Sequence, residues 1–469
     1  MSALPGAATG PGTRRGADSF GAGARALGRT GLTVSPIAFG AGRVRDEAPL
    51  HRRALADALR GGVNLIDTCG KDGAQRVVGR MLANLVQHGE LRREQVVVVS
   101  RLGRPAPEQS SLDPSFVRAE VERSRQALGV QTLDVALLHE PEPAVEQADD
   151  AFRGAFEVLE ALVREGSLGW YGVSSRAFAD RTLSVEHLLR LATDVGGASH
   201  RFGVVRTPLN LFELGAVLPE EGAQTCLAQA AAADVGVIAH RPLEAFVDRG
   251  PSVLRLADMP VTHGSMSDAA ELLARVRKLE AEWASGLGQQ LMVGPGDNAV
   301  DLFRWGQELA PRLSALSLEQ WVHLRHDVVA VHLGRTSAAL LDALEGDTRR
   351  AFAAWWERYG TCLHDAFDAI EATLRVRRHD LAQRIGRALD PLLPAPWRPL
   401  PLSNKAILTS LSAPVSAVAV GMRQPGYVHD VLALRDHPVR LMGASAGPVD
   451  WGALASAMAE VELSAPAVD

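Results

Sequence analysis

Cysteine is scarce in this chain, because only Cys69, Cys226 and Cys362 occur among 469 residues. Their wide separation matches neither the short spacing of metal ligands nor the paired framework of a disulfide-stapled secreted domain. The cysteine pattern therefore predicts no metal site and a reducing, cytoplasmic environment.

Basic runs and long hydrophobic runs are also missing. The formal net charge is −6, and no stretch interleaves basic with aromatic side chains, so the electrostatic footprint of a nucleic-acid-binding protein is absent. Hydrophobic residues make up 46% of the chain, which is enough for a sizeable core. No uninterrupted apolar stretch reaches the roughly 18 residues that a membrane helix needs. We expect no nucleic-acid partner and no membrane span.

The chain does contain a series of short apolar runs rich in Val, Ile and Leu, typical of strands buried on both faces. Helical stretches separate the runs. Asp113 and Pro114 form an N-cap and first-turn pair for one of them, and Gly129 closes it. Eight strands alternating with helices predict an α/β protein of the (β/α)8 TIM-barrel class. The alternative is a doubly wound sheet, but no Gly-x-Gly-x-x-Gly follows the first strand. The eight runs are residues 36–40, 63–67, 96–101, 134–139, 170–174, 202–207, 235–240 and 415–420.

The chain is too long for a barrel alone, since a typical TIM barrel has about 250 residues. The surplus predicts a mostly helical insertion over residues 247–400, between the seventh and eighth strands. Residues 25–246 then form the first part of the barrel, and residues 401–469 form the last strand–helix unit and a C-terminal tail. Residues 1–24 are rich in Gly, Ala, Ser and Pro and are expected to be a disordered tail.

The insertion begins directly after a barrel strand, and such loops open on the catalytic face of a TIM barrel. We therefore expect the helical block to lie over the mouth as a lid. Its aromatic segment contains Trp355, Trp356 and Tyr359, which are the side chains we expect to wall the pocket. The alternative is a packing module or homodimer module that never touches ligand.

Five segments, in order along the chain, resemble the aldo-keto reductases, which are NADP-linked oxidoreductases with a TIM-barrel fold. GGVNLIDT is similar to the family's strand end GxNxxDTA, and RALGRTGLTVSP is similar to its opening LGxTGLxVS. The segments are residues 25–36, 61–68, 124–139, 166–175 and 418–427. The resemblance implies a small-molecule carbonyl or alcohol substrate and NADP as the cofactor.

The resemblance also implies where the catalytic groups lie. The family uses a Tyr as proton donor, a Lys that lowers its pKa, an Asp that orients the Lys, and a His beside the substrate oxygen. Asp67 and His139 match the family's Asp and His. The Tyr position holds Asp72 and the Lys position holds Arg101, and these two side chains would form an ion pair. An ionised Asp72 could not serve as an acid at neutral pH, so the ordinary mechanism is in doubt.

Three other groups could take the role of the missing acid. His139 could donate the proton itself, because imidazole titrates near neutral pH. Lys71 could swing into the site, or Tyr359 of the insertion could restore a phenol in space.

The cofactor positions implied by the resemblance are also mixed. Ser174 and Ser175 stand where the family has Ser-Asn against the nicotinamide carboxamide. Arg206 stands at a Gln position, and His240 stands where a ring stacks on nicotinamide. At the adenosine end, a helix N-terminus and a basic side chain would meet the phosphates, and the matching residues there are Gly421 and Arg423.

Three functional hypotheses follow. The first is a divergent NADP-dependent oxidoreductase with weak or altered catalysis. The second is a catalytically inactive barrel used for ligand sensing or protein interaction. The third is a non-redox barrel enzyme with His139 as the base. The retained Asp67, His139 and Arg423 favour the first hypothesis, whereas the missing Tyr and Lys favour the other two.

Overall fold

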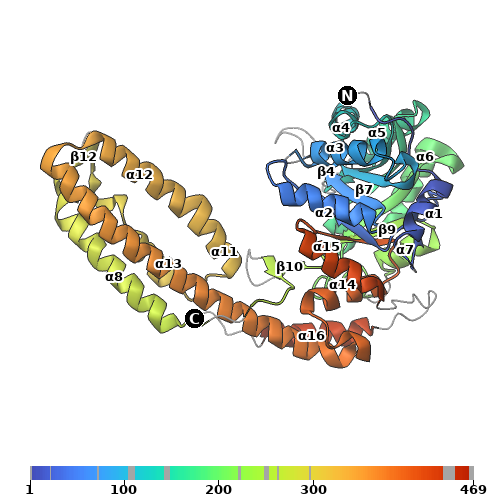
Figure 1. Ribbon diagram of the computed structural model, residues 1–469. Helices are drawn as coiled ribbons and strands as arrows, with labels where there is room; N and C mark the ends of the chain where they lie inside the picture. Colours follow the sequence, from blue (N-terminus) through green and yellow to red (C-terminus); the bar gives the residue numbers. More distant parts are fainter. Residues whose placement is uncertain are drawn as a thin grey trace. The chain divides into compact units, whose positions relative to one another are not determined.

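The computed structural model describes residues 3–21, 23–70, 73–103, 111–141, 148–219, 223–247, 253–260, 263–294, 297–436 and 449–463 (Figure 1). The chain divides into two compact units. The barrel unit comprises Met1–Phe246 and Ala388–Glu460, and the helical unit comprises Val247–Arg387 and Val461–Asp469. The inserted unit therefore ends earlier than the expected residue 400.

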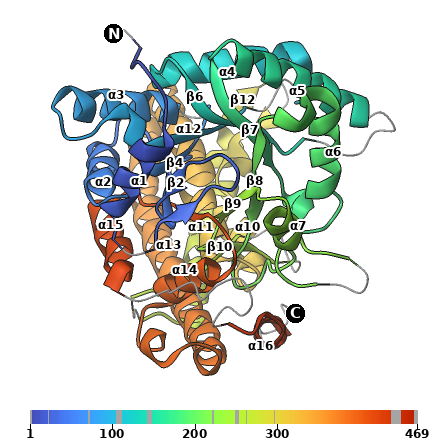
Figure 2. The ribbon, with the colours of Figure 1, turned by 90° about the vertical axis from the view of Figure 1, so that its right-hand side faces the viewer.

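The barrel unit contains a closed barrel of eight parallel strands, as the apolar runs predicted (Figure 2). The strands pair in the order β14-β3-β4-β5-β6-β7-β8-β9, so the last strand in sequence closes the barrel between the first and the seventh. Their side chains are buried on both faces because helices cover the outside. The strands are β3 (Ile37–Gly40), β4 (Leu65–Cys69), β5 (Val97–Arg101), β6 (Leu133–His139), β7 (Leu168–Ser174), β8 (Phe202–Pro208), β9 (Gly236–His240) and β14 (Ala417–Val420).

Helices alternate with these strands and surround them (Figure 2). The predicted start of one helix is confirmed, because the Asp113 carboxylate accepts hydrogen bonds from the amides of Ser115 and Phe116. Gly129 ends this helix at φ 63°, a left-handed conformation that favours glycine. The helices are α2 (Pro49–Arg60), α3 (Ala74–Gln87), α4 (Pro114–Leu128), α5 (Ala148–Arg164), α6 (Val185–Gly196), α7 (Cys226–Ala232), α14 (Leu402–Ser412), α15 (Pro425–Leu432) and α16 (Trp451–Leu463).

The N-terminal segment differs from the disordered tail expected for residues 1–24. It contains helix α1 (Gly10–Asp18), and the short antiparallel pair β1 (Arg25–Ala26) and β2 (Thr33–Val34) follows it. The glycines allow close packing here. A Cβ on Gly12 would lie 2.4 Å from the carbonyl oxygen of Glu94. A high glycine content is typical of disorder, but here glycine allows the segment to pack tightly against the barrel.

A buried carboxylate fixes this segment to the barrel. Asp134, on β6, accepts a hydrogen bond from the amide of Ala8 at 2.7 Å and one from the amide of Val98 at 2.8 Å. It also forms an ion pair of 2.8 Å with Arg93, and both side chains are buried. Its oxygens therefore connect three parts of the chain that are far apart in sequence.

The segment that returns from the helical unit is held in a similar way. The guanidinium of Arg25, on β1, donates to the carbonyl oxygens of Val415 at 2.7 Å and Leu411 at 2.9 Å. Burial lowers the pKa of Arg25 to about 10. These bonds tie the N-terminal hairpin to the turn before β14, the strand that closes the barrel.

The helical unit has a hydrophobic core of its own. Two of its helices are long: α8 (Met266–Ser285), and α13 (Gly346–Leu389), which continues past the boundary of the unit. Side chains of both helices share this core, whereas Val322 and Val328, which lie between the two helices in sequence, are exposed. The other described elements after β9 are β10 (Glu244–Phe246), β11 (Val253–Arg255), α9 (Leu287–Gln290), β12 (Met292–Gly294), β13 (Asp297–Asn298), α10 (Trp305–Leu309), α11 (Leu318–His323) and α12 (Ala330–Ala343).

The aromatic segment of α13 belongs to this core. Trp355 is buried, and its ring centroid lies 4.8 Å from that of Trp283 and 4.8 Å from that of Tyr359. The Tyr359 hydroxyl donates to the Glu280 carboxylate at 3.2 Å, inside the same unit. The expectation that Trp355 and Tyr359 wall a pocket, or that Tyr359 supplies a catalytic phenol, is therefore wrong, because their side chains fill the helical unit itself.

Among the described residues, no helix combines the length and the apolar character needed to cross a membrane.

The role of Asp134 leads to a prediction about stability. Asp134→Ala should lower the free energy of unfolding by about 3–5 kcal/mol, because it leaves the buried Arg93 without its counter-charge. Urea denaturation of the full chain, followed by tryptophan fluorescence, measures the change. Glu165→Ala is the control, since Glu165 pairs with Arg118 on the surface and its loss should leave the midpoint nearly unchanged. Equal midpoints for the two variants would contradict the prediction.

Candidate active site

Polar side chains gather at the C-terminal ends of six neighbouring barrel strands. In a parallel barrel these ends lie on one face, which is the face where TIM-barrel enzymes carry their active sites. Strand register places His139 beside Ser174, and Ser174 beside Arg206. The side chains, in strand order from β4 to β9, are Asp67, Arg101, His139, Ser174, Arg206 and His240.

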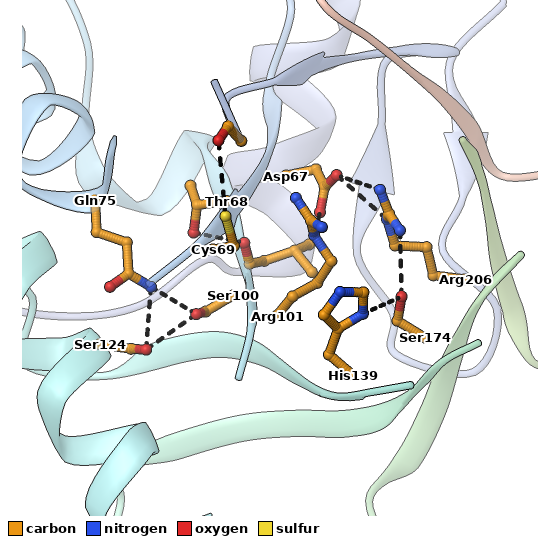
Figure 3. Close-up of polar contacts among 12 residues, drawn as sticks. Asp67, Thr68, Cys69, Gln75, Ser100, Arg101, Ser124, His139, Ser174 and Arg206 are labelled. Carbon is orange, nitrogen blue, oxygen red and sulfur yellow. Dashed lines mark hydrogen bonds and ion pairs between the residues drawn. The ribbon is translucent and has the colours of Figure 1, made fainter. Parts of the chain in front are cut away.

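Asp67 is the centre of this cluster (Figure 3). One carboxylate oxygen accepts a hydrogen bond of 3.2 Å from Arg101 Nε. The other oxygen accepts bonds from Arg206 Nε at 3.2 Å and Arg206 Nη2 at 3.0 Å. A single buried carboxylate is therefore shared by two guanidinium groups.

The two arginines determine the charge of Asp67. Burial by itself would raise its pKa, but the positive charges of Arg101 and Arg206 outweigh burial, and the pKa lies below its usual value. Burial lowers the pKa of Arg206 to about 10, although Asp67 opposes this shift. Burial alone would lower the pKa of Arg101, but the charges of Asp67, Cys69 and Glu140 and the hydrogen bond to Asp67 together raise it. All three groups are ionised at neutral pH.

Ser174 extends the cluster from Arg206 to His139 (Figure 3). Its hydroxyl accepts a hydrogen bond of 3.2 Å from Arg206 Nη1 and lies 3.4 Å from His139 Nδ1. Ser174 thus connects His139 to Arg206, which in turn bonds to Asp67. Their convergence could be predicted from the strand ends, whereas the bond between Arg206 and Asp67 could not.

His240 lies against the positive charges of the cluster. It is only 7% exposed, and its buried Nε2 has no hydrogen-bond partner among the described residues. Burial, followed by the charges of Arg206, Arg241 and Arg101, holds the pKa of His240 well below its usual value. The ring is therefore neutral at physiological pH and could stack on a planar group.

Ser175 has a structural contact that its sequence position did not indicate. Its hydroxyl accepts a hydrogen bond from the amide of Ala177 at 3.0 Å, which caps the short 3-10 helix Arg176–Phe178. The same hydroxyl donates to Glu140 at 3.3 Å. The Ser175 side chain thus shapes the loop after β7, and a carboxamide would have to compete with these bonds.

The segment after β14 could hold phosphate groups. Gly421 and Met422 lead to Arg423, which is half-buried, and α15 begins two residues later. Gln424, the N-cap of α15, gives this helix no side-chain cap, so its first-turn amides are available to an anion. The space around a Cβ at Gly421 is open. Burial, then the charge of Arg423, lowers the pKa of nearby His51, which indicates a positive field here.

Asp72, the predicted ionic partner of Arg101, and Lys71 lie outside the described residues. The described ionic partner of Arg101 is Asp67.

Several polar residues of this region were not predicted from the sequence. Behind the site, the Gln75 amide donates to Ser100 at 2.7 Å and to Ser124 at 3.0 Å, which fixes the helices α3 and α4 to β5 (Figure 3). At the rim, Glu140 and Arg241 have φ angles of 47° and 59°, which are strained for residues other than glycine. Each residue directly follows a histidine that ends a strand. This position next to a candidate site residue is the sequence feature that could have identified both.

The comparisons with known proteins agree with this geometry. The Aldo/keto reductase family model matches residues 36–249. The 6-dehydroglucose reductase of Novosphingobium aromaticivorans is 29% identical over 185 residues, which are 36% of this chain and 57% of that protein. The D-arabinose 1-dehydrogenase of Saccharomyces cerevisiae is 30% identical over 140 residues, which are 30% of this chain and 40% of that protein. This chain thus spans about half the length of these relatives.

Among solved structures, the glycerol dehydrogenase of Gluconobacter oxydans is similar with a TM-score of 0.46 and 16% identity. The similarity covers 95% of this chain and 96% of that chain.

The shared carboxylate leads to a prediction with a defined pH dependence. Asp67→Asn should cost about 3–5 kcal/mol of stability at neutral pH, because two buried guanidinium groups lose their counter-charge. Since the folded-state pKa of Asp67 is lowered, its contribution is present above the unfolded pKa and is lost as the pH falls through the folded pKa. The gap between wild type and variant should therefore shrink in acid.

Urea denaturation at a series of pH values measures this gap. Asp57→Asn is the control, because the partly exposed Asp57 pairs with Arg53 and Arg60 only at 3.6 and 3.7 Å, and its loss should have little effect at any pH. A gap for Asp67→Asn that stays constant into acid would argue against the assigned ionisation.

Proposed function

Because the chain belongs to the aldo-keto reductase superfamily, we propose that its barrel unit is a divergent NADP-dependent oxidoreductase. Its substrate would be a small carbonyl compound or the corresponding alcohol. The observation that carries the proposal is the convergence of Asp67, Arg101, His139, Ser174 and Arg206 in one bonded cluster at the C-terminal ends of β4 to β8.

The residues for a nicotinamide nucleotide are present in part. Such a nucleotide, when bound, supplies or accepts a hydride. Arg423, Gly421 and the N-terminus of α15 would hold its phosphates, and His240 would lie against its nicotinamide ring. Ser174, Ser175 and Arg206 stand at the carboxamide positions, but their side chains are already bonded to one another or to neighbouring groups. Because these side chains are already bonded, we expect the nucleotide to bind more weakly than is usual for the family.

Carbonyl reduction needs stabilisation of negative charge on the substrate oxygen and transfer of a proton to it, and two different side chains can supply these roles. Arg101 keeps a positive charge at all relevant pH values, so it can stabilise negative charge on a substrate oxygen but cannot transfer a proton. His139 can transfer one, because imidazole titrates near neutral pH. Its Nδ1 lies 3.4 Å from Ser174 Oγ, a contact that orients the ring. We therefore assign the proton transfer to His139.

The internal bonding of Ser175 and Arg206 also favours a second candidate. A barrel whose carboxamide contacts are taken up by its own side chains could be catalytically inactive and serve ligand sensing or protein interaction. Nucleotide binding and turnover separate the two candidates. A cytoplasmic location and a homodimer formed through the helical unit remain part of the proposal. The free state of the three cysteines supports the former, and the exposed Val322, Val328 and Val331 support the latter.

We predict that the protein binds NADPH with micromolar or weaker affinity and prefers it to NADH, because Arg423 and the α15 N-terminus favour added phosphate charge. Arg423→Ala should weaken NADPH binding by about 1–3 kcal/mol, the typical value of a charge-assisted hydrogen bond. Titration calorimetry measures both effects, with Arg118→Ala on the outer face of α4 as the control. No heat with either nucleotide at millimolar concentration would favour the inactive barrel.

Turnover of simple aldehydes should be about 10²–10⁴-fold slower than is ordinary for the family, because a positioned tyrosine acid is missing. The residual rate should disappear in His139→Ala and persist in His88→Ala, an exposed histidine at the end of α3. Oxidation of NADPH, followed by absorbance, reports the rate. If His139→Ala retains the rate of the wild type, another group transfers the proton and the role given to His139 is wrong.

A further inference from the structure

The ion pair between Arg101 and Asp67 uses only one side of the guanidinium group. Arg101 Nε donates to Asp67 at 3.2 Å. The terminal nitrogens Nη1 and Nη2 make no hydrogen bond with any described residue, and the side chain is 14% exposed. The end of the guanidinium fork, which binds two oxygens in a plane, is therefore available at the mouth of the barrel.

The charges around this fork do not balance among the described residues. Asp67 is shared by Arg101 and Arg206, and Glu213 pairs with Arg241. The Glu140 carboxylate accepts from the backbone amide of Arg176 at 3.2 Å, beside the charge of that side chain. Among the described groups, Arg101, Arg206 and Arg241 thus face three carboxylates, and the exposed Arg176 adds one positive charge at the solvent-facing rim.

Because Arg176 is exposed, this extra charge is solvated, and it attracts an anion without requiring one. Neither histidine of the site offsets it, since a neutral imidazole carries no negative charge. A ligand anion at the Arg101 fork would therefore be attracted by this net positive charge.

A glycine leaves room for the fork. A Cβ added to Gly42, in the loop after β3, would lie 2.8 Å from Arg101 Nη2. Gly42 does not need the left-handed conformation of glycine, because no positive φ occurs there. An alanine at this position would thus move the end of the Arg101 side chain without changing any charge.

We propose that the site takes carbonyl compounds that carry a carboxylate on the reacting carbon, namely 2-oxo acids, and that the Nη1–Nη2 edge of Arg101 holds this carboxylate. The inference rests on the proposed oxidoreductase function and names its substrate class. The adjacent oxygens of a 2-oxo acid lie in one plane, which suits the planar fork of an arginine and not the single ammonium of a lysine.

The reaction balances with the partners already named. The carbonyl carbon receives a hydride from NADPH, which is oxidised to NADP⁺, and the π electrons of the C=O bond move to oxygen. His139 protonates that oxygen and regains a proton from solvent. The product is a 2-hydroxy acid. Arg101 holds the carboxylate and remains charged throughout.

Binding of oxalate, a planar dicarboxylate, tests the fork without nucleotide. Titration calorimetry of the full chain should show binding that weakens at least about tenfold in Arg101→Lys, which keeps the charge but loses the fork. Gly42→Ala should weaken it as well. Arg118→Lys is the matched control, since Arg118 contacts Glu165 through both terminal nitrogens at 3.0 Å on the barrel exterior, and oxalate binding should not change.

If the unfolding curve of Arg101→Lys shows that this variant does not fold, the oxalate affinity of Gly42→Ala alone tests the proposal. Absence of oxalate binding to the wild type, or equal affinity in the wild type and Gly42→Ala, overturns the proposal.

Turnover supplies a second measurement. Pyruvate and its neutral amide, pyruvamide, have the same shape around the ketone. The proposal expects kcat/KM with NADPH to be about 10²-fold higher for pyruvate, as a charge-assisted bidentate contact would give, and expects Arg101→Lys to remove most of this preference. Equal kcat/KM values would overturn the substrate class while leaving the oxidoreductase function intact. Fork-dependent oxalate binding without any NADPH binding would instead refute that function and retain the anion site.

Discussion

The catalytic face of this barrel depends on one carboxylate that two guanidinium groups share. Asp67 lies in β4, and its partners Arg101 and Arg206 lie at the end of β5 and near the end of β8. Because each charge would be costly to bury alone, the three side chains fix one another and, through Ser174, orient His139. The neutral state of His240 and the open edge of the Arg101 fork both follow from this arrangement. Charged side chains that hold one another in place, and no phenol, thus make up the described centre of the candidate site.

The barrel itself could be predicted from sequence because its strands are short apolar runs and its helices have clear caps, such as Asp113 and Gly129. Such signals are local. Helix α1 was missed because Gly12 serves a close contact with Glu94, a residue about 80 positions away, so its composition was typical of disorder. A glycine-rich segment that packs closely has the same local composition as a disordered one when its packing partner lies far away in the sequence.

The same distinction applies to the candidate site. The family resemblance predicted that Asp67, Arg101, His139 and Ser174 would belong to one site, and the parallel strands that carry them do end on one face. The pairing of Arg206 with Asp67 depends on side-chain length and on the charges of both neighbours. A position that the resemblance assigned to cofactor binding thus carries an internal ion pair, which no single motif could indicate.

The insertion between β9 and β14 has a consequence for synthesis of the protein. The barrel cannot close until residues 417–420 have emerged from the ribosome, long after the seventh strand. During this interval β3 and β9 each have an unpaired edge, and such edges are prone to pair with other chains. The helical unit has its own core and can fold first. The nascent chain should therefore need protection by a chaperone or slow translation through the insertion, and its yield should be sensitive to the rate of elongation.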